Sequence, residues 1–206
     1  CGIMKKMNIA NKLTFARVIL AFLILLLIGL PWHNFGVEWP SYVLVGRITL
    51  RLNYLIGGVL FILASLTDML DGKAARKLGL VSDFGKVFDA IADKILVNGL
   101  LIVLAYNRDI ALIVPVVIIT RDIIVDAIKM LSGNKGKVVA ASMAGKVKTA
   151  CMMSGLCLLF FGGLPFSLLG IAVDQGLILF ATCMSVYSGI QYFLVNKDVA
   201  FGDMNK

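Results

Sequence analysis

The sequence has little charge for its length. Asp, Glu, Lys and Arg together make up only 16% of the 206 residues, whereas 60% are hydrophobic and the mean hydropathy is +0.94. About a quarter of the residues of an average soluble domain are charged. The scarcity of charge, with apolar runs recurring along the whole chain, excludes a soluble domain and predicts an integral membrane protein.

Residues that usually bind transition metals are also scarce. The chain has a single histidine, His33, which stands beside Trp32 and near Trp39. Such a group is typical of the aromatic belt at a membrane interface and does not indicate a metal site. Three of the four cysteines lie within apolar segments, where they serve as small hydrophobic residues; they are Cys151, Cys157 and Cys183.

The apolar runs are long enough to cross a bilayer, which takes about 20 residues per helix. Short Gly-, Pro- and Asn-containing segments separate them, with no polar domain between. We therefore predict an all-α membrane domain over residues 15–196, preceded by an arm (1–14) and followed by a tail (197–206). The six predicted spans are Phe15–Leu30, Tyr54–Leu70, Val87–Tyr106, Ile110–Leu131, Ala150–Leu169 and Leu177–Leu194.

The distribution of basic residues predicts the orientation of these spans. Most Lys and Arg residues lie in the N-terminal arm, in the connections after the second and fourth spans, and in the tail. The positive-inside rule then places both termini in the cytoplasm of a multi-pass protein of the cell membrane. The net charge of +8 is accordingly interpreted as a basic rim facing anionic lipid head groups, and no nucleic-acid partner is expected.

Four aspartates interrupt this apolar chain within the stretch DMLDGKAARKLGLVSDFGKVFDAIAD. Asp68 and Asp71 are three residues apart, and Asp89 and Asp93 are four apart, so each pair shares one helix face. Their helices are joined by a short connection and should be neighbours, which would bring all four carboxylates into one pocket open to the cytoplasm. Four unpaired carboxylates would repel each other, and an oxygen-only cluster suits Mg²⁺ or Mn²⁺. The sequence predicts a site for two divalent ions.

Small residues surround these aspartates. Gly72 and Ala75 follow Asp71, and Gly85 comes one turn before Asp89, so a flat group could approach the backbone closely. Arg76 adds a bidentate fork suited to phosphate. Metal ions, a guanidinium that can bind phosphate through two hydrogen bonds, and a wall of small residues together predict a site for a nucleoside diphosphate.

The full pattern resembles the signature of the CDP-alcohol phosphotransferases at every fixed position: Asp68-x2-Asp71-Gly72-x2-Ala75-Arg76-x8-Gly85-x3-Asp89-x3-Asp93. The resemblance implies a six-helix, usually homodimeric membrane enzyme that moves a phosphatidyl or similar group from a CDP-linked donor to an alcohol and releases CMP. By the same resemblance, Asp68, Asp71 and Asp89 hold two metal ions, and Asp93 is both a ligand and the general base. The CDP site is then lined by Gly72, Ala75, Arg76 and Gly85, together with Ser82.

Further segments are similar to the phosphatidylglycerophosphate synthases within this family. They are NIANKLTFARVIL near the N-terminus, TRDIIVDAIK, and GKVKTA at residues 145–150. This similarity implies CDP-diacylglycerol as donor and glycerol 3-phosphate as acceptor, with Asn11 and Thr14 helping to close the nucleotide site. Because the acceptor is an anion, fixed cations are expected near the metal ions, and Arg121, Lys146 and Lys148 are the candidates. Snorkelling at the interface is the alternative for the two lysines, and a pair with Asp122 or Asp126 is the alternative for Arg121.

The sequence departs from its relatives at Ala10 and Ala90, where they often have proline, and at Asp122, where they usually have glutamate. Acids beside Arg121 could weaken phosphate binding or select another acceptor.

Three alternative functions remain. They are a sister enzyme that uses inositol phosphate, serine or phosphatidylglycerol, a cation or proton transporter, and a structural subunit with metal-linked helices. The aspartates cluster at one edge instead of forming a path across the membrane, which disfavours the transporter.

Overall fold

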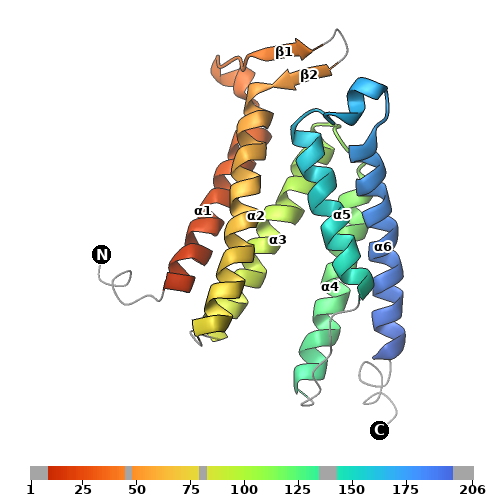
Figure 1. Cartoon of the computed structure of the whole chain (residues 1–206). Coiled ribbons are helices and arrows are strands. Elements are labelled where there is room, and N and C mark those ends of the chain that lie inside the picture. Colours follow the sequence, from red (N-terminus) through yellow and green to blue (C-terminus); the bar gives the residue numbers. More distant parts are fainter. Residues whose placement is uncertain (1–8, 45–47, 79–82, 135–142, 197–206) are drawn as a thin grey trace. The chain divides into compact units, whose positions relative to one another are not determined.

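A computed structural model describes residues 9–44, 48–78, 83–134 and 143–196 of the chain, and for residues 9–13, 68–78 and 83–89 it describes the backbone alone. The described part is mainly helical (Figure 1). Its elements are α1 (Ile9–Gly29), the 3₁₀ turn η1 (Trp32–Phe35), β1 (Ser41–Leu44), β2 (Ile48–Arg51), α2 (Leu52–Leu78), α3 (Asp83–Tyr106), α4 (Ile113–Asn134), α5 (Met143–Phe160), η2 (Phe166–Leu169) and α6 (Val173–Val195).

Each predicted span corresponds to one α-helix, but the fifth was misplaced. The predicted span ran from Ala150 to Leu169, whereas α5 runs from Met143 to Phe160. The chain turns after Phe160 because Gly162 and Gly163 adopt positive φ angles of 67° and 72°, a conformation that ends a helix. Within the described residues, α5 and α6 are long and apolar enough to cross a membrane, and shorter apolar helices cover 14–29 and 52–67.

The chain packs as two compact units. The first contains residues 1–109 with Phe160–Gly162, and the second contains the rest. In the first unit, α1 packs against both α2 and α3 through small and aliphatic side chains such as Ala21, Ile24 and Leu100, which are fully buried. Close approach is possible at Gly58 of α2, where a Cβ atom would lie 2.7 Å from the Cβ of Phe160.

A short antiparallel hairpin, which the sequence analysis did not predict, joins α1 to α2. It pairs Ser41 with Arg51 and Leu44 with Ile48, and β1 is exposed along its whole length. Figure 1 shows the hairpin beyond the end of α1 and the start of α2. It places Arg51 directly before the first turn of α2.

The second unit contains α4, α5, η2 and α6. Helices α4 and α6 pack along their lengths, and α5 approaches α6 at Gly155, where a Cβ atom would lie 3.2 Å from the carbonyl oxygen of Asp174. The buried face of α6 is built from small and hydroxyl-bearing residues as well as apolar ones: Ile178, Ala181, Thr182, Ser185, Ser188 and Tyr192. Such a face lets neighbouring helices come close in a membrane and offers hydrogen bonds between them.

Candidate functional site

The motif aspartates lie on two helices of the first unit. Asp68 and Asp71 fall within α2, and Asp89 and Asp93 fall within α3, so the helical spacing assumed from the sequence is present in both pairs. Of the four, Asp93 is the one whose side chain is described. The other predicted residues whose side chains lie outside the described part are Asn11, Gly72, Ala75, Arg76 and Gly85, and Ser82 lies outside it altogether.

Asp93 is held by an arginine that the site prediction missed. Arg17 of α1 is 1% exposed, and its Nη1 lies 3.5 Å from Oδ1 of Asp93, whose side chain is 51% exposed. A guanidinium this deeply buried needs an anion nearby, because an uncompensated buried charge costs several kcal/mol. The pair connects α1 to α3 at the motif. Thr14, one turn before Arg17 on α1, is also buried.

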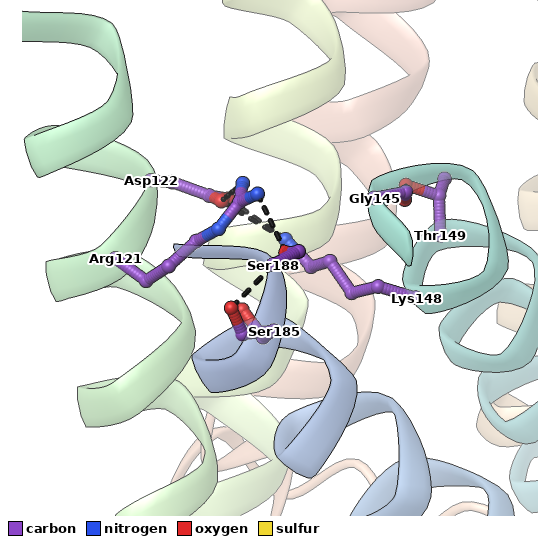
Figure 2. A network of polar contacts seen from close by, with 7 residues as sticks. All are labelled: Arg121, Asp122, Gly145, Lys148, Thr149, Ser185 and Ser188. Atoms are coloured by element: carbon purple, nitrogen blue, oxygen red, sulfur yellow. Dashed lines mark hydrogen bonds and ion pairs between the residues drawn. The ribbon is translucent and has the colours of Figure 1, made fainter. Parts of the chain in front are cut away.

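A second polar cluster lies within the other unit and joins three helices (Figure 2). Arg121 and Asp122 come from α4, Lys148 from α5, and Ser188 from α6. Oδ1 of Asp122 accepts hydrogen bonds from Arg121 Nη1 at 3.0 Å and from Lys148 Nζ at 2.9 Å. Nη2 of Arg121 donates to the Ser188 hydroxyl at 2.8 Å, and that hydroxyl donates to the carbonyl oxygen of Ser185 at 3.1 Å.

Packing against α6 fixes the course of the Arg121 side chain. A Cβ atom at Gly189 would lie 2.9 Å from Cγ of Arg121, so glycine leaves the space through which the aliphatic stem passes. The charged side chains remain partly accessible, at 16% for Arg121, 19% for Asp122 and 11% for Lys148. The cluster is therefore oriented by its surroundings and can still be reached by a ligand.

The ion pairs that join this cluster leave one positive charge in excess. Arg121 and Lys148 are two cations, and they share the one carboxylate of Asp122. Partly buried fixed cations with spare donors bind phosphate well. Lys146, two residues before Lys148 on α5, is exposed, and residues two apart on a helix do not share a face. The structure thus brings together two of the three cations predicted for the acceptor and leaves the third apart.

Some of these residues could have been found from the sequence. Ala181, Ser185, Ser188 and Gly189 recur at helical spacing along α6, a pattern of small residues that indicates a helix contact in a membrane. Arg17 interrupts an apolar run, which by itself indicates a functional or paired charge. From the sequence, Asp122 was considered as an obstacle to phosphate binding and as a partner of Arg121, but not as a partner of Lys148, whereas it holds both Arg121 and Lys148 in place.

Comparison with known proteins assigns the family. The sequence pattern of the CDP-alcohol phosphatidyltransferase family matches residues 7–187. The chain belongs to this family. Membership makes it a membrane-bound transferase, which removes the transporter and the structural subunit from consideration.

Individual members of the family match over most of the chain. The chain is 36% identical to a protein of Bacillus subtilis over 92% of its own length and 95% of that protein. It is 40% identical to a Mycoplasma genitalium protein over 73% of this chain and 64% of that protein. It is 30% identical to a Rickettsia felis protein over 92% of this chain and 96% of that protein. All three relatives are named CDP-diacylglycerol–glycerol-3-phosphate 3-phosphatidyltransferase.

CDP-alcohol phosphatidyltransferases generally depend on divalent metal ions, and carboxylates such as those of the motif are suitable ligands for such ions. Within residues 14–44, 48–67, 90–134 and 143–196, no three His, Cys, Asp or Glu side chains gather as a metal site. The motif carboxylates, which the sequence predicts as ligands, would form an oxygen-only set that matches hard ions such as Mg²⁺ or Mn²⁺.

Substitution of Arg17 tests whether it positions Asp93. Arg17→Met should lower kcat of the transferase reaction by about 10- to 100-fold, because a carboxylate displaced by about 1 Å loses that much. The KM for the CDP-linked donor should change little, and Arg17→Lys should restore part of kcat. Steady-state CMP release measures both constants. If Arg17→Met lowers only the melting temperature and leaves kcat intact, Arg17 has a structural role alone.

Proposed function

We propose that this protein transfers the phosphatidyl group of CDP-diacylglycerol to glycerol 3-phosphate, giving phosphatidylglycerophosphate and CMP. The observation that carries the proposal is the cluster of Arg121, Asp122 and Lys148, whose excess positive charge suits an acceptor that is itself a phosphate. The names of the relatives support the same acceptor. Serine, which carries no net charge near neutral pH, would not need such a cluster.

The proposed reaction is a displacement at phosphorus. The acceptor hydroxyl attacks the phosphorus that carries the diacylglycerol, the bond between this phosphorus and the bridging oxygen of the diphosphate breaks, and CMP leaves with that oxygen. Asp93 takes the proton of the attacking hydroxyl as general base. Arg17 orients Asp93 through the 3.5 Å contact. Arg121 and Lys148 bind the phosphate of glycerol 3-phosphate, which need not react.

Two divalent ions, Mg²⁺ or Mn²⁺, complete the proposed site. Asp68, Asp71, Asp89 and Asp93 would hold them, and the ions would offset the charge of the diphosphate and of the departing CMP. The CDP-lipid would lie against Gly72, Ala75, Arg76 and Gly85, with Asn11, Thr14 and Ser82 closing the nucleotide site. The acyl chains of the donor can remain in the bilayer because the enzyme itself is a membrane protein.

The proposed topology follows from the helices and the charges together. Each of the six α-helices would cross the cell membrane, with the arm 1–14, the tail 197–206 and the aspartate pocket on the cytoplasmic side. Helices α2, α3 and α4 contain charged residues within otherwise apolar segments, which is the usual mark of a functional site inside a membrane protein. The resemblance to the family further implies a homodimer.

The acceptor is the part of the proposal that most needs testing. Purified protein in detergent would receive CDP-diacylglycerol and Mg²⁺ with one of four acceptors: glycerol 3-phosphate, inositol phosphate, serine or phosphatidylglycerol. We expect metal-dependent CMP release with glycerol 3-phosphate alone. Release with one of the other three would assign the chain to a sister enzyme of the same family, and no release from folded protein with any of them would contradict the proposed reaction.

A further inference from the structure

A polar cavity lies in the first unit, where α1 and α3 end and α2 begins. It has a volume of about 520 Å³, within the range of small-molecule sites. The end of α1, the segment after it, the start of α2 and the end of α3 form its walls. Along α3, Asp93 and Tyr106 are 13 residues or about 20 Å apart, so the cavity is separate from the proposed catalytic site.

One wall of this cavity is fixed by hydrogen bonds. The Asn107 side-chain amide donates to the Tyr54 hydroxyl at 3.0 Å and to the carbonyl oxygen of Ile28 at 3.2 Å, and the Tyr54 hydroxyl donates to Asp109. Burial raises the pKa of Asp109. The hydrogen bond from Tyr54 and the charge of Arg51 act in the opposite direction and lower it, but burial has the larger effect. Asp109 is thus engaged with the wall, and these contacts connect the ends of all three helices.

Two buried polar groups of the cavity lack a counterpart in the described part of the chain. Asn53 is 8% exposed, and its Oδ1 has no hydrogen-bond partner there. The indole Nε1 of Trp39 is also a buried atom without a hydrogen-bond partner there. A buried polar atom left unpaired costs about 1–3 kcal/mol. Rotation of the Asn53 amide about χ2 exchanges its oxygen and nitrogen, so this residue can present an acceptor to the cavity that it lines.

The remaining charged and aromatic groups define what would fit. Arg51 lines the cavity with its guanidinium 5.6 Å from the centre of the Tyr54 ring, an exposed fork suited to a phosphate. Glu38 adds a carboxylate, and the rings of Trp32 and Trp39 meet edge to face at 5.8 Å. A carboxylate, an amide oxygen and indole faces together favour an ammonium group. The cavity therefore combines a place for a phosphate with a place for a cation.

The surroundings indicate that this ligand comes from the bilayer. Tyr106 at the rim is 77% exposed, and the loop and hairpin beside the cavity expose Phe35 at 68% and Val43 at 64%. Exposed aromatic and apolar side chains at the end of membrane helices lie at the level of the lipid head groups. We propose that the cavity binds the head group of a zwitterionic aminophospholipid, with its phosphate at Arg51 and its ammonium group between Asn53 and Glu38.

The two tryptophans give a direct assay, because the chain has only Trp32 and Trp39 and both line the cavity. Short-chain phosphatidylethanolamine, added to the protein in an uncharged detergent, should change the tryptophan emission in a saturable way. Short-chain phosphatidylglycerol, free phosphoethanolamine and inorganic phosphate should give no comparable saturable change. An equal response to phosphatidylglycerol would overturn the ammonium assignment, an equal response to either soluble compound would overturn the lipid origin, and no saturable response at all would overturn the site.

Two variants locate the binding within the cavity. Asn53→Leu and Arg51→Met should each raise the Kd by about tenfold or more, as the loss of a hydrogen bond to a charged group does. Asn53→Leu removes an unpaired amide and should not lower the melting temperature, while Arg51 is exposed and its replacement should leave the fold intact. Arg108→Met, an exposed arginine outside the cavity lining, is the matched control. Unchanged Kd values in both cavity variants would contradict the proposal, and this test requires no transferase activity.

Discussion

Asp93→Asn is expected to lower kcat by about 10²- to 10⁴-fold, the usual contribution of a general base. Asparagine has nearly the same shape and keeps a side-chain oxygen that can still accept from Arg17, so the contact between α1 and α3 should persist. The variant should therefore fold and still bind the donor, while the acceptor hydroxyl loses the group that takes its proton. Steady-state CMP release, with both substrates varied, measures this effect.

A matched acid separates the catalytic loss from a general effect of removing a carboxylate. Asp174 lies in the first turn of α6, outside the motif, and Asp174→Asn should keep kcat near the wild-type value. It should cost at most about 1 kcal/mol of stability through the helix dipole. Wild-type turnover in Asp93→Asn would exclude Asp93 as the base, and an equal loss in both variants would show that the assay reports damage to the fold.

Lys148→Met is expected to raise the KM for glycerol 3-phosphate by about 10- to 100-fold, because a hydrogen bond to a charged group contributes about 1.5–3 kcal/mol. Removal of this cation leaves Asp122 paired with Arg121 alone, so the cluster loses its excess positive charge. The KM for CDP-diacylglycerol should change much less. Initial rates with each substrate varied in turn give both constants.

Lys146→Met provides the comparison within the same helix. Lys146 is exposed and stands apart from the cluster, whereas Lys148 is buried against Asp122, so the same change at Lys146 should have the smaller effect on the acceptor KM. Equal increases in the KM of donor and acceptor on Lys148→Met would argue against a role in binding the acceptor phosphate. A larger effect at Lys146 than at Lys148 would contradict the assignment as well.

The helical framework was predictable because its physical cause is local. Apolar runs of membrane length predicted every α-helix, and the spacing of Asp68 with Asp71 and of Asp89 with Asp93 predicted that each pair would lie within one helix.

Two features between the helices were predicted wrongly or missed. The predicted end of α5 was nine residues too late because Leu164 to Leu169 is apolar, and this hydrophobicity was given more weight than the turn signal of Gly162 and Gly163. The hairpin was missed because the connection was interpreted only as an interfacial loop, although Tyr42, Val43, Ile48 and Thr49 favour strands.

The partners of the charged residues could not be predicted from local sequence. Asp122 is adjacent to Arg121 in the chain, and a simple pair was one expected alternative, which the 3.0 Å contact confirms. That Lys148 shares the same carboxylate depends on how α4 and α5 pack, as does the position of Ser188. Arg17 and Asp93 are 76 residues apart, and only the packing of α1 against α3 joins them.

The fate of the acceptor oxygen tests the central claim most directly. Glycerol 3-phosphate labelled with ¹⁸O at its C1 hydroxyl would be incubated with CDP-diacylglycerol, Mg²⁺ and the purified protein, and the lipid product and CMP would be analysed by mass spectrometry. The proposed displacement predicts one ¹⁸O atom in phosphatidylglycerophosphate, none in CMP, and equal amounts of the two products. Label in CMP, or a phosphatidylglycerophosphate product without label, would contradict attack of the acceptor hydroxyl on the lipid-bearing phosphorus.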